Sequence, residues 1–453
     1  MPRLWRDLEA GRIRIMFYRI ISSEDTEDEI YIYSKDNIKG EDITISSGGR
    51  SCRARLESKT NMKKNEVVIS SNLLEELLIP ENLEYQISFN EGEMRIGPVI
   101  GLLVFKSKRR LTSGGLRKLN SYTNIYQEIR GLLVALSVDN IDLENKCVQG
   151  YYYNPEGENK KGSWKKGVFP MPDSIFQRTL LTETMRASLK EETKNCLFNS
   201  NYFNKWEFWQ LISKYGPCSK NLPYTRLYSN FEDVDYIIEN YGSAYLKPLN
   251  GTLSRGLYKV TLEGSNYRFL DKQGEEVASL NTKEESEEFI RNTMGRHRYL
   301  VQQGINPLRV KGRYMDFRVI MQKDDTMNWS CTGIIALIGA RGDICTNWGS
   351  TSTFDDILYK AFNFSQKDIF KKKREVIAAC KCVCEMLDET GENYGDLGFD
   401  VMIDEQLNVW VLEANKRHYH TVPLWVNDVQ TFYNTKSNPI KYAAAIAGFK
   451  VYK

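Results

Sequence analysis

The 453-residue sequence contains no apolar run that approaches the ~20 residues of a membrane-spanning helix, so we expect no membrane span. It also lacks a strong net charge. A formal value of +3 gives no global electrostatic reason to expect nucleic acid or a membrane surface as partner. Internal repeats, heptads and low-complexity tracts are absent, which argues against solenoids and coiled coils. The first residues are charged and lead into no apolar segment, so we expect no secretory signal.

Cysteine is present in an odd number, nine, with irregular spacing. We therefore expect no disulfide framework and a reducing, cytoplasmic setting. Cys380, Cys382 and Cys384 lie in a segment with helical periodicity. Positions two apart do not share a helix face, so the three thiols cannot converge on one metal ion. We expect them to be ordinary buried residues.

The length allows about two to four domains, and local patterns suggest three segments. Residues 1–92 carry β-branched and aromatic runs typical of a small β-rich module. Residues 93–190 open on an apolar run expected of a buried parallel strand, followed by a predicted helix over 122–136, which suggests an α/β layer fold. Residues 191–450 alternate strand and helix patterns over a longer stretch.

A lysine stands at the end of a predicted strand, in AYLKPLNGTLSRG, where Lys247 precedes a loop over residues 250–256. Glycine lets backbone N–H groups approach phosphate oxygens, and Ser254, Arg255 and Gly256 would line such a loop. Lys247 would then contact the phosphates as a point charge. Neither a Walker A nor a G-x-G-x-x-G pattern is present. A hairpin with a surface lysine remains the alternative.

Two further strands follow in order. Residues 299–305 form an apolar strand that leads into a polar break, a setting in which backbone groups can read a nucleotide base. In the next strand, alternation puts Asp316, Arg318 and Ile320 on one face. The Arg318 guanidinium either faces a transferred phosphoryl group or an acceptor carboxylate, or forms a structural ion pair with Asp316.

A predicted hairpin near the C-terminus joins residues 397–404 to residues 408–415. Glu413 and Asn415 are two apart on one strand and share a face, and Asp400 on the partner strand reaches that face in a suitable register. Two carboxylates and an amide oxygen are hard ligands that suit Mg²⁺. Packing alone does not explain such a polar set on an apolar hairpin, because buried carboxylates are costly without a cation.

In this order, the lysine strand, the polar break, the D-x-R strand and the D…E-x-N hairpin resemble the ATP-grasp superfamily. The chain most resembles the YheC/YheD-like endospore coat-associated proteins of spore-forming Firmicutes over about residues 60–450. The stretches that carry this resemblance are Ile96–Gly101, Val168–Arg178, Phe203–Trp206, Leu222–Thr225 and Asp316–Arg318.

The resemblance implies a mixed α+β and α/β architecture. Two α+β subdomains, about 191–300 for the nucleotide and 301–450 for the metal, would grip ATP. A Rossmann-like pre-ATP-grasp domain at 93–190 and the N-terminal module would precede them. The implied cofactors are ATP and Mg²⁺. The implied nucleotide contacts are Lys205, Lys247, Ser254, Arg255, Gly256, Gln302 and Gln303, and the implied metal ligands are Asp400, Glu413 and Asn415.

The segment after Asn415 departs from the family, since it reads Lys-Arg-His-Tyr-His. We interpret Lys416–His418 as a solvated loop, with an anion-binding acceptor site as the alternative. We also expect His418 and His420 to be surface residues rather than metal ligands.

The implied activity is a carboxylate–amine ligase that forms an acyl phosphate from an amino acid or peptide, with Arg318, Lys247 and Arg255 as catalytic residues. The alternatives are a structural spore-coat protein that binds nucleotide without turnover and an ATP-grasp kinase. Spore-coat proteins are possible partners, in the mother-cell cytoplasm or the coat. The sequence identifies neither the acceptor carboxylate nor the amine.

Overall fold

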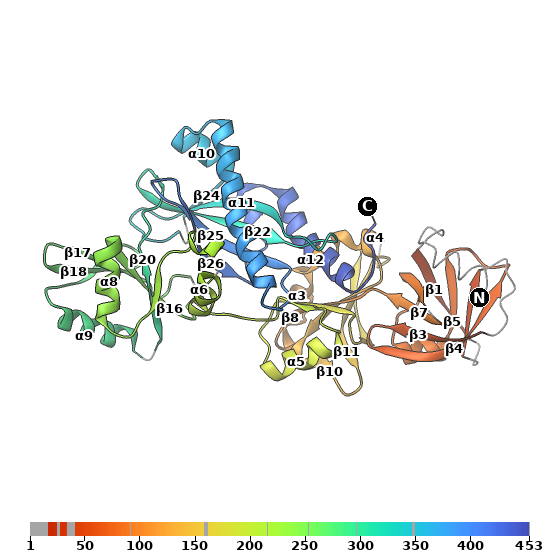
Figure 1. Cartoon of the computed structure of the whole chain (residues 1–453). Helices are drawn as coiled ribbons and strands as arrows, with labels where there is room; N and C mark the ends of the chain where they lie inside the picture. The colour runs from red at the N-terminus through yellow and green to blue at the C-terminus, as the bar shows by residue number, and fades with distance from the viewer. Residues whose placement is uncertain are drawn as a thin grey trace. The chain divides into compact units, whose positions relative to one another are not determined.

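The computed structural model describes residues 17–24, 28–33, 41–90, 92–157, 162–214, 216–251, 253–295, 297–346 and 349–452 (Figure 1). The expectation for the first residues of the chain, and Thr252 in the expected lysine loop, fall outside these ranges. The chain forms two compact units. Unit 1 comprises Met1–Ser200, Lys323–Asn328 and Lys436–Lys453, and unit 2 comprises Asn201–Gln322 and Trp329–Thr435. Within the ranges given, no helix is both long enough and apolar enough to cross a membrane.

In unit 1, the β-rich segment takes the form of a closed barrel in the order β1-β5-β2-β4-β3-β7-β6 (Figure 1). Its strands are β1 (Phe17–Ser23), β2 (Glu29–Tyr33), β3 (Glu41–Ser47), β4 (Arg50–Lys59), β5 (Glu66–Ser70), β6 (Glu84–Asn90) and β7 (Glu93–Gly97). Helix α2 (Ser71–Leu77) packs against β4 and β5. Alternate side chains of β4 are buried, because successive residues of a strand point to opposite faces and only one face lines the interior.

The second sheet of unit 1 has the order β10-β11-β9-β8-β13-β14, with β12 beside β11. Its strands are β8 (Val99–Phe105), β9 (Leu132–Ser137), β10 (Ile141–Asp142), β11 (Cys147–Asn154), β12 (Ser163–Pro170), β13 (Ser174–Gln177) and β14 (Leu197–Phe198). Strand β8 pairs in parallel with β9 and with β13, and its first five residues are buried, as its apolar run predicts. The short helices are α3 (Ser113–Arg117), α4 (Tyr126–Ile129) and α5 (Glu183–Glu192).

The prediction of a helix over residues 122–136 is wrong for the residues after Ile129. Helix α4 stops at Ile129, and the buried strand β9 starts at Leu132. Arg130 and Gly131 between them have φ values of 52° and 74°. A Cβ on Gly131 would lie 2.4 Å from the Pro98 carbonyl oxygen, so the chain passes too close to β8 for a larger residue. The apolar run was compatible with either element, and parallel pairing with β8 decided it.

The end of the chain returns to unit 1. Helix α12 (Val429–Ile446) begins in unit 2, and its second half belongs to unit 1. There Ile440, Ala443 and Ala444 pack in one core with Phe176 and Phe198 of β13 and β14. Residues far apart in sequence therefore complete this core.

Unit 2 contains two mainly antiparallel sheets. The first has the order β15-β20-β16-β17-β18-β19. Its strands are β15 (Thr225–Leu227), β16 (Ser243–Pro248), β17 (Tyr258–Glu263), β18 (Asn266–Leu270), β19 (Glu276–Leu280) and β20 (Tyr299–Gln303). Helices α8 (Phe231–Tyr241) and α9 (Lys283–Met294) bury their apolar residues in one core with this sheet. The predicted lysine strand and the predicted strand at 299–305 are both confirmed, as β16 and β20, and the structure adds that these two strands pair.

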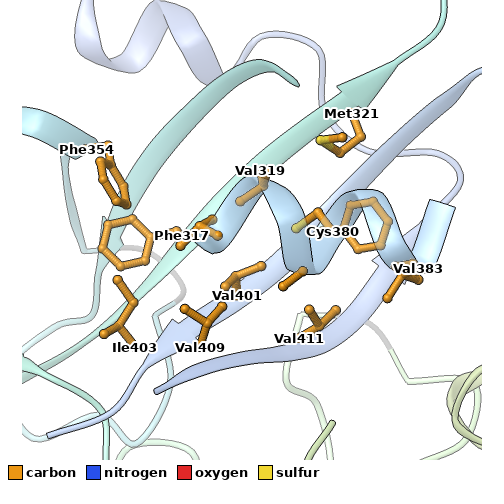
Figure 2. Close-up of a cluster of buried hydrophobic side chains, with 14 of the residues drawn as sticks. Phe317, Val319, Met321, Phe354, Cys380, Val383, Val401, Ile403, Val409 and Val411 are labelled. Carbon is orange, nitrogen blue, oxygen red and sulfur yellow. The ribbon is translucent and has the colours of Figure 1, made fainter. Parts of the chain in front are cut away.

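The second sheet of unit 2 has the order β24-β23-β22-β25-β26, with β21 beside β22. Its strands are β21 (Arg309–Val310), β22 (Arg313–Gln322), β23 (Ser330–Ile338), β24 (Ser350–Thr353), β25 (Asp396–Ile403) and β26 (Val409–Asn415). One face packs on helices α10 (Phe354–Phe362) and α11 (Gln366–Asp388) through a core that includes Phe317, Val319, Val401 and Val411 (Figure 2). The predicted hairpin is confirmed as β25 and β26.

Helix α11 carries the three clustered cysteines, and one of them does not behave as expected. Cys380 and Cys384 are buried, one helical turn apart, and neither takes part in the disulfide. Cys382 forms a disulfide with Cys218 of the short helix α7 (Gly216–Ser219), with a Cα–Cα distance of 5.9 Å. The expectation that Cys382 is an ordinary buried residue is therefore wrong. Cys382 is two residues from Cys380 and therefore lies on a different face of the helix. Helix α7 packs against that face.

Candidate functional site

The lysine at the end of β16 lies beside the glutamines of β20. Lys247 Nζ donates a hydrogen bond to Gln302 Oε1 at 2.6 Å, and Gln302 Nε2 donates to Thr225 Oγ1 at 3.0 Å. Burial lowers the pKa of Lys247 to about 8, although the Glu413 carboxylate opposes this shift. Gln303 Oε1 accepts a hydrogen bond from the Tyr224 backbone N–H at 3.0 Å. The structure thus brings Lys247 and Gln302 together, whereas the Gln303 side chain bonds to Tyr224 and makes no such contact with Lys247.

Lys205 is the first residue of helix α6 (Lys205–Ser213). Its ammonium donates to the Gly251 carbonyl oxygen at 2.8 Å and lies 3.6 Å from Glu413 Oε2. It therefore connects the loop after Lys247 to the carboxylates of the other sheet. Sequence alone gave this position only by resemblance, and the contact with Glu413 was not foreseen.

A capping box at Asn204 fixes the start of α6. The Asn204 side chain accepts from the Trp206 and Glu207 N–H groups at 2.9 and 3.0 Å, and Glu207 Oε2 accepts from the Asn204 N–H at 2.8 Å. Such a reciprocal pair satisfies donors that the first helical turn leaves unpaired. It also sets the direction in which Lys205 leaves the helix.

We expect Asn204→Ala to lower the free energy of unfolding by about 1 kcal/mol, because the first turn loses its acceptor. Nucleotide affinity should fall as well, because the first turn of α6 no longer holds the Lys205 backbone in place. Denaturant unfolding and nucleotide titration measure the two effects. Asn230, which caps α8, is the matched control. Asn230→Ala should cost a similar amount of stability and leave the affinity unchanged. Equal affinity losses in both variants would contradict this role for Asn204.

The predicted phosphate loop follows β16. Ser254 and Gly256 have φ values of 52° and 71°, so the chain turns sharply there. Arg255 is exposed and forms no ion pair with any residue in the ranges that the structure describes. The structure therefore places these residues on the loop without bringing the Arg255 guanidinium to Lys247 or the carboxylates.

Three adjacent strands place charged side chains in register. Arg318 on β22 pairs with Asp400 on β25, and Asp400 pairs with Glu413 on β26. Arg318 Nε donates to Asp400 Oδ1 at 2.6 Å. Asn415 Nδ2 donates to Glu413 Oε1 at 3.0 Å and lies 3.5 Å from Asp400 Oδ2. Asp400, Glu413 and Asn415 therefore meet on one face of the sheet, opposite the α11 core, as the hairpin pattern predicted.

The two carboxyl groups of this cluster, Asp400 and Glu413, have pKa values shifted in opposite directions. Burial, with the nearby Glu413 carboxylate, raises the pKa of Asp400 to about 6 in spite of Arg318. Burial opposes ionisation of Glu413 too, but Lys205 and hydrogen bonds from Asp400 and Asn415 lower its pKa to about 2. Glu413 is thus the permanent anion, and Asp400 holds its proton more readily than a free carboxyl group.

Asp316 is a further carboxyl group on this face. Burial and the Asp400 charge raise its pKa to about 8, and Thr346 Oγ1 donates a hydrogen bond to its Oδ2. The ion-pair partner of Arg318 is Asp400 rather than Asp316, the alternative that the sequence left open. Thr346 was not found from sequence, because it lies in a loop 30 residues from Asp316 and in no motif.

The donor set fits a divalent cation such as Mg²⁺. Asp400 and Glu413 contribute oxygens from neighbouring strands, and rotation of the Asn415 amide would present its Oδ1 in place of the nitrogen that now faces them. Burial and the Glu413 charge raise the pKa of Asp400, so a cation bound at these oxygens would favour the ionised form of this carboxyl group. Beside them, a cavity of about 10 Å³ is bounded by side chains that include Lys205, Lys247 and Glu413. It has room for about one water molecule, so a nucleotide base requires its walls to move.

The segment after Asn415 is not the solvated loop that we expected. Lys416, His418 and His420 have exposures of 7%, 3% and 3%, whereas Arg417 and Tyr419 between them are exposed. Lys416 Nζ donates to the Phe203 carbonyl oxygen at 2.6 Å, and burial lowers the pKa of Lys416 to about 7. The surface expectation for both histidines is wrong, because their partner, Asp396, lies more than 20 residues earlier in sequence.

Comparison with known proteins identifies the family to which this chain belongs. The family model for YheC/D-like ATP-grasp domains matches residues 194–446, and the chain belongs to this family. The predicted ATP-grasp fold is therefore confirmed.

The chain is similar along almost its whole length to the endospore coat-associated protein YheD of Bacillus subtilis (strain 168). The two are 23% identical over 448 residues, which cover 95% of this chain and 96% of YheD. YheC of the same organism is 21% identical over 274 residues, or 56% of this chain and 73% of YheC. Among solved structures, D-alanyl-alanine synthetase A from Vibrio cholerae O1 biovar eltor str. N16961 matches with a TM-score of 0.43 and 13% identity, over 76% of this chain and 98% of that one.

Proposed function

We propose that this protein is a Mg·ATP-dependent carboxylate–amine ligase that acts through an acyl phosphate. One observation carries the proposal. Two lysines, Lys205 of α6 and Lys247 of β16, lie around the same Glu413 carboxylate that Asp400 and Asn415 approach from the sheet. Such a mixed cluster of cations and oxygen donors suits a metal-bound polyphosphate.

The proposed reaction has two balanced steps. A carboxylate oxygen of the first substrate attacks the γ-phosphorus of ATP, and ADP leaves. The nitrogen of an amine then attacks the acyl carbon, inorganic phosphate leaves, and the amine gives up a proton. Bound Mg²⁺ would neutralise charge on the phosphate oxygens.

Within this proposal the side chains divide the work. Lys247 and Lys205 hold the phosphates, and Arg318 steadies both Asp400 and the transferring group. Gln302 and Gln303 lie beside the adenine base of ATP. Ser254, Arg255 and Gly256 approach the phosphates when the loop after β16 closes. Asp400, Glu413 and Asn415 hold the metal.

An amino acid or peptide is the proposed substrate class, and the protein would act in spore coat or envelope formation. The description of YheD and YheC as endospore coat-associated proteins supports this setting, with coat proteins as partners in the mother-cell cytoplasm or the coat. The division at residues 1–92, 93–190 and 191–450, with nucleotide and metal subdomains meeting near residue 300, is part of the same proposal.

Incubation of the purified chain with Mg·ATP and pools of amino acids or peptides tests the activity. ADP and phosphate that appear only when both a carboxylate and an amine are supplied, together with a product joined by an amide, support the ligase. ADP with a phosphorylated acceptor and no need for an amine identifies a kinase instead. Bound ATP with no ADP under any pool identifies a nucleotide-binding scaffold.

Nucleotide binding should be coupled to a proton. The pKa of Lys247 is lowered to about 8 in the free chain, so at pH 8.5 most of its side chains are neutral. A neighbouring triphosphate favours the ammonium form, so we expect ATP to bind with proton uptake at this pH and with much less at pH 6.5. The lowered pKa also affects stability, because the unfolded chain binds this proton more readily than the folded chain does. The free energy of unfolding therefore decreases as pH falls from about 10.5 to 8.

Calorimetric titration in buffers of different ionisation enthalpy measures this uptake. Lys247→Arg is the control, since arginine stays charged at every pH used. Proton uptake at pH 8.5 should fall sharply in the variant. Equal uptake in both chains would show that another group, such as Lys416, takes up the proton.

A further inference from the structure

Two of the three histidines in the chain converge on one carboxylate in unit 2. Asp396 is the first residue of β25, and His418 and His420 lie on the segment that follows β26. His418 Nε2 lies 2.9 Å from Asp396 Oδ1, and His420 Nε2 lies 2.7 Å from Asp396 Oδ2. The exposures of Asp396, His418 and His420 are 0%, 3% and 3%. A carboxylate and two imidazoles therefore share an interior site that the nucleotide chemistry above does not use.

Surrounding residues fix the orientation of the carboxylate. Gln322 Nε2 donates to Asp396 Oδ1 at 2.7 Å and to the Thr435 carbonyl oxygen at 2.9 Å. Thr332 Oγ1 in turn donates to Gln322 Oε1 at 2.8 Å. Outer hydrogen bonds of this kind hold metal-binding carboxylates in many proteins and are nearly as important as the ligands.

A glycine makes the approach of His418 possible. Gly398 lies between Asp396 and Asp400 on β25, and a Cβ on it would be 2.6 Å from the Cβ of His418. Any larger residue would push the imidazole away from the strand. The cluster therefore depends on backbone proximity as well as on the three side chains.

We propose that Asp396, His418 and His420 bind a zinc ion, at a site separate from the Mg·ATP site. Two imidazole nitrogens and a carboxylate oxygen are a common zinc ligand set, and a water or a further protein oxygen can take the fourth position. The three ligand atoms all lie within 4.8 Å of one another. Imidazole nitrogen favours Zn²⁺ over Mg²⁺, whereas the all-oxygen set at Asp400 and Glu413 has the opposite preference.

The geometry requires only a small opening. Ligand atoms around a tetrahedral zinc at about 2.1 Å are about 3.4 Å apart, against 2.9 and 2.7 Å for the present nitrogen–oxygen contacts. Each ring would therefore have to move away from the carboxylate by roughly half an ångström. The ring protons would have to lie on Nδ1, so that each Nε2 presents its lone pair. The competing account is a hydrogen-bonded His–Asp–His lock without an ion.

Zinc would clamp the segment after Asn415 to the start of β25, in the same hairpin that carries Asp400 and Glu413. The ion would thus position the strands of the nucleotide site and would not touch ATP. Its presence does not depend on the proposed ligase activity, and the two can fail separately.

The test uses the full-length chain, stripped with a chelator and dialysed. Titration with Zn²⁺ against a chromophoric chelator, in excess Mg²⁺, should show one equivalent bound at micromolar concentration. His418→Gln and His420→Gln should each weaken zinc binding by at least about 100-fold. His297→Gln is the matched control, because His297 is the third histidine and is exposed. It should leave zinc binding unchanged.

Cobalt supplies a readout that does not depend on affinity alone. Co²⁺ at the site should give visible absorption, and His420→Cys should retain one equivalent while adding a thiolate-to-cobalt band in the near ultraviolet. This variant keeps a ligand, so it decides the matter if a glutamine variant fails to fold. The proposal is overturned if the stripped wild-type chain takes up no zinc, or if neither glutamine substitution weakens uptake, or if the cysteine variant shows no thiolate band.

Discussion

Replacement of Glu413 by glutamine is expected to reduce Mg·ATP-dependent ADP formation by at least about 100-fold. Glu413 is the permanent anion of the site, with its pKa lowered to about 2, and it lies 3.6 Å from the Lys205 ammonium. Glutamine keeps the shape but removes the charge that the two lysines and the proposed metal share. Mg²⁺-dependent nucleotide affinity, measured by titration with and without Mg²⁺, should fall in parallel.

Glu405 offers a matched control on the same hairpin, because it lies exposed in the turn between β25 and β26. Glu405→Gln removes one negative charge at a similar place in the sequence and should leave both quantities within a factor of two or so. If Glu413→Gln bound Mg·ATP as tightly as the wild-type chain, the oxygen cluster would not be the metal site.

Removal of the Arg318 side chain should produce the second large effect, on stability. Arg318 and Asp400 are an ion pair at 2.6 Å with side-chain exposures of 13% and 19%. Arg318→Met would leave Asp400 buried beside Glu413 and Asp316 without its ion-pair partner. The expected loss is about 3–5 kcal/mol in the free energy of unfolding, measured by denaturant titration at neutral pH without Mg²⁺.

A double variant separates charge from packing. Arg318→Met combined with Asp400→Asn removes both partners and should recover more than half of the lost stability, because no unpaired charge remains. Arg313→Met, at the start of the same strand, should change stability by no more than about 0.5 kcal/mol. A double variant as unstable as the single one would show that Arg318 stabilises the sheet by packing.

Short-range patterns were enough to place the main strands of unit 2. The hairpin of β25 and β26 was predictable because apolar residues alternate with Asp400, Glu413 and Asn415, and a two-residue period fixes which side chains share a face. Lys247 was predictable for a similar reason, since it ends an apolar strand and precedes a glycine-bearing loop. Their meeting with Lys205 required the resemblance to a known family, because no local pattern relates α6 to β26.

Contacts across long sequence separations escaped prediction. His418 and His420 look like residues of a polar loop until Asp396 is placed beside them, and Cys382 appears equivalent to Cys380 until α7 is packed on its side of the helix. Likewise, the run after Gly131 fits a helix or a strand until its pairing with β8 is known. In each case a distant segment supplies the deciding interaction.

The return of α12 to unit 1 has a consequence for biosynthesis. Ile440, Ala443 and Ala444 complete the core around Phe176 and Phe198, yet the ribosome makes all of unit 2 between these two groups. Unit 2 can therefore reach its native state first. During that time Phe176 and Phe198 of β13 and β14 lack the α12 residues that cover them in the folded chain. A nascent chain halted near residue 435 would expose this apolar surface. We expect molecular chaperones to bind the chain most strongly at that stage of translation.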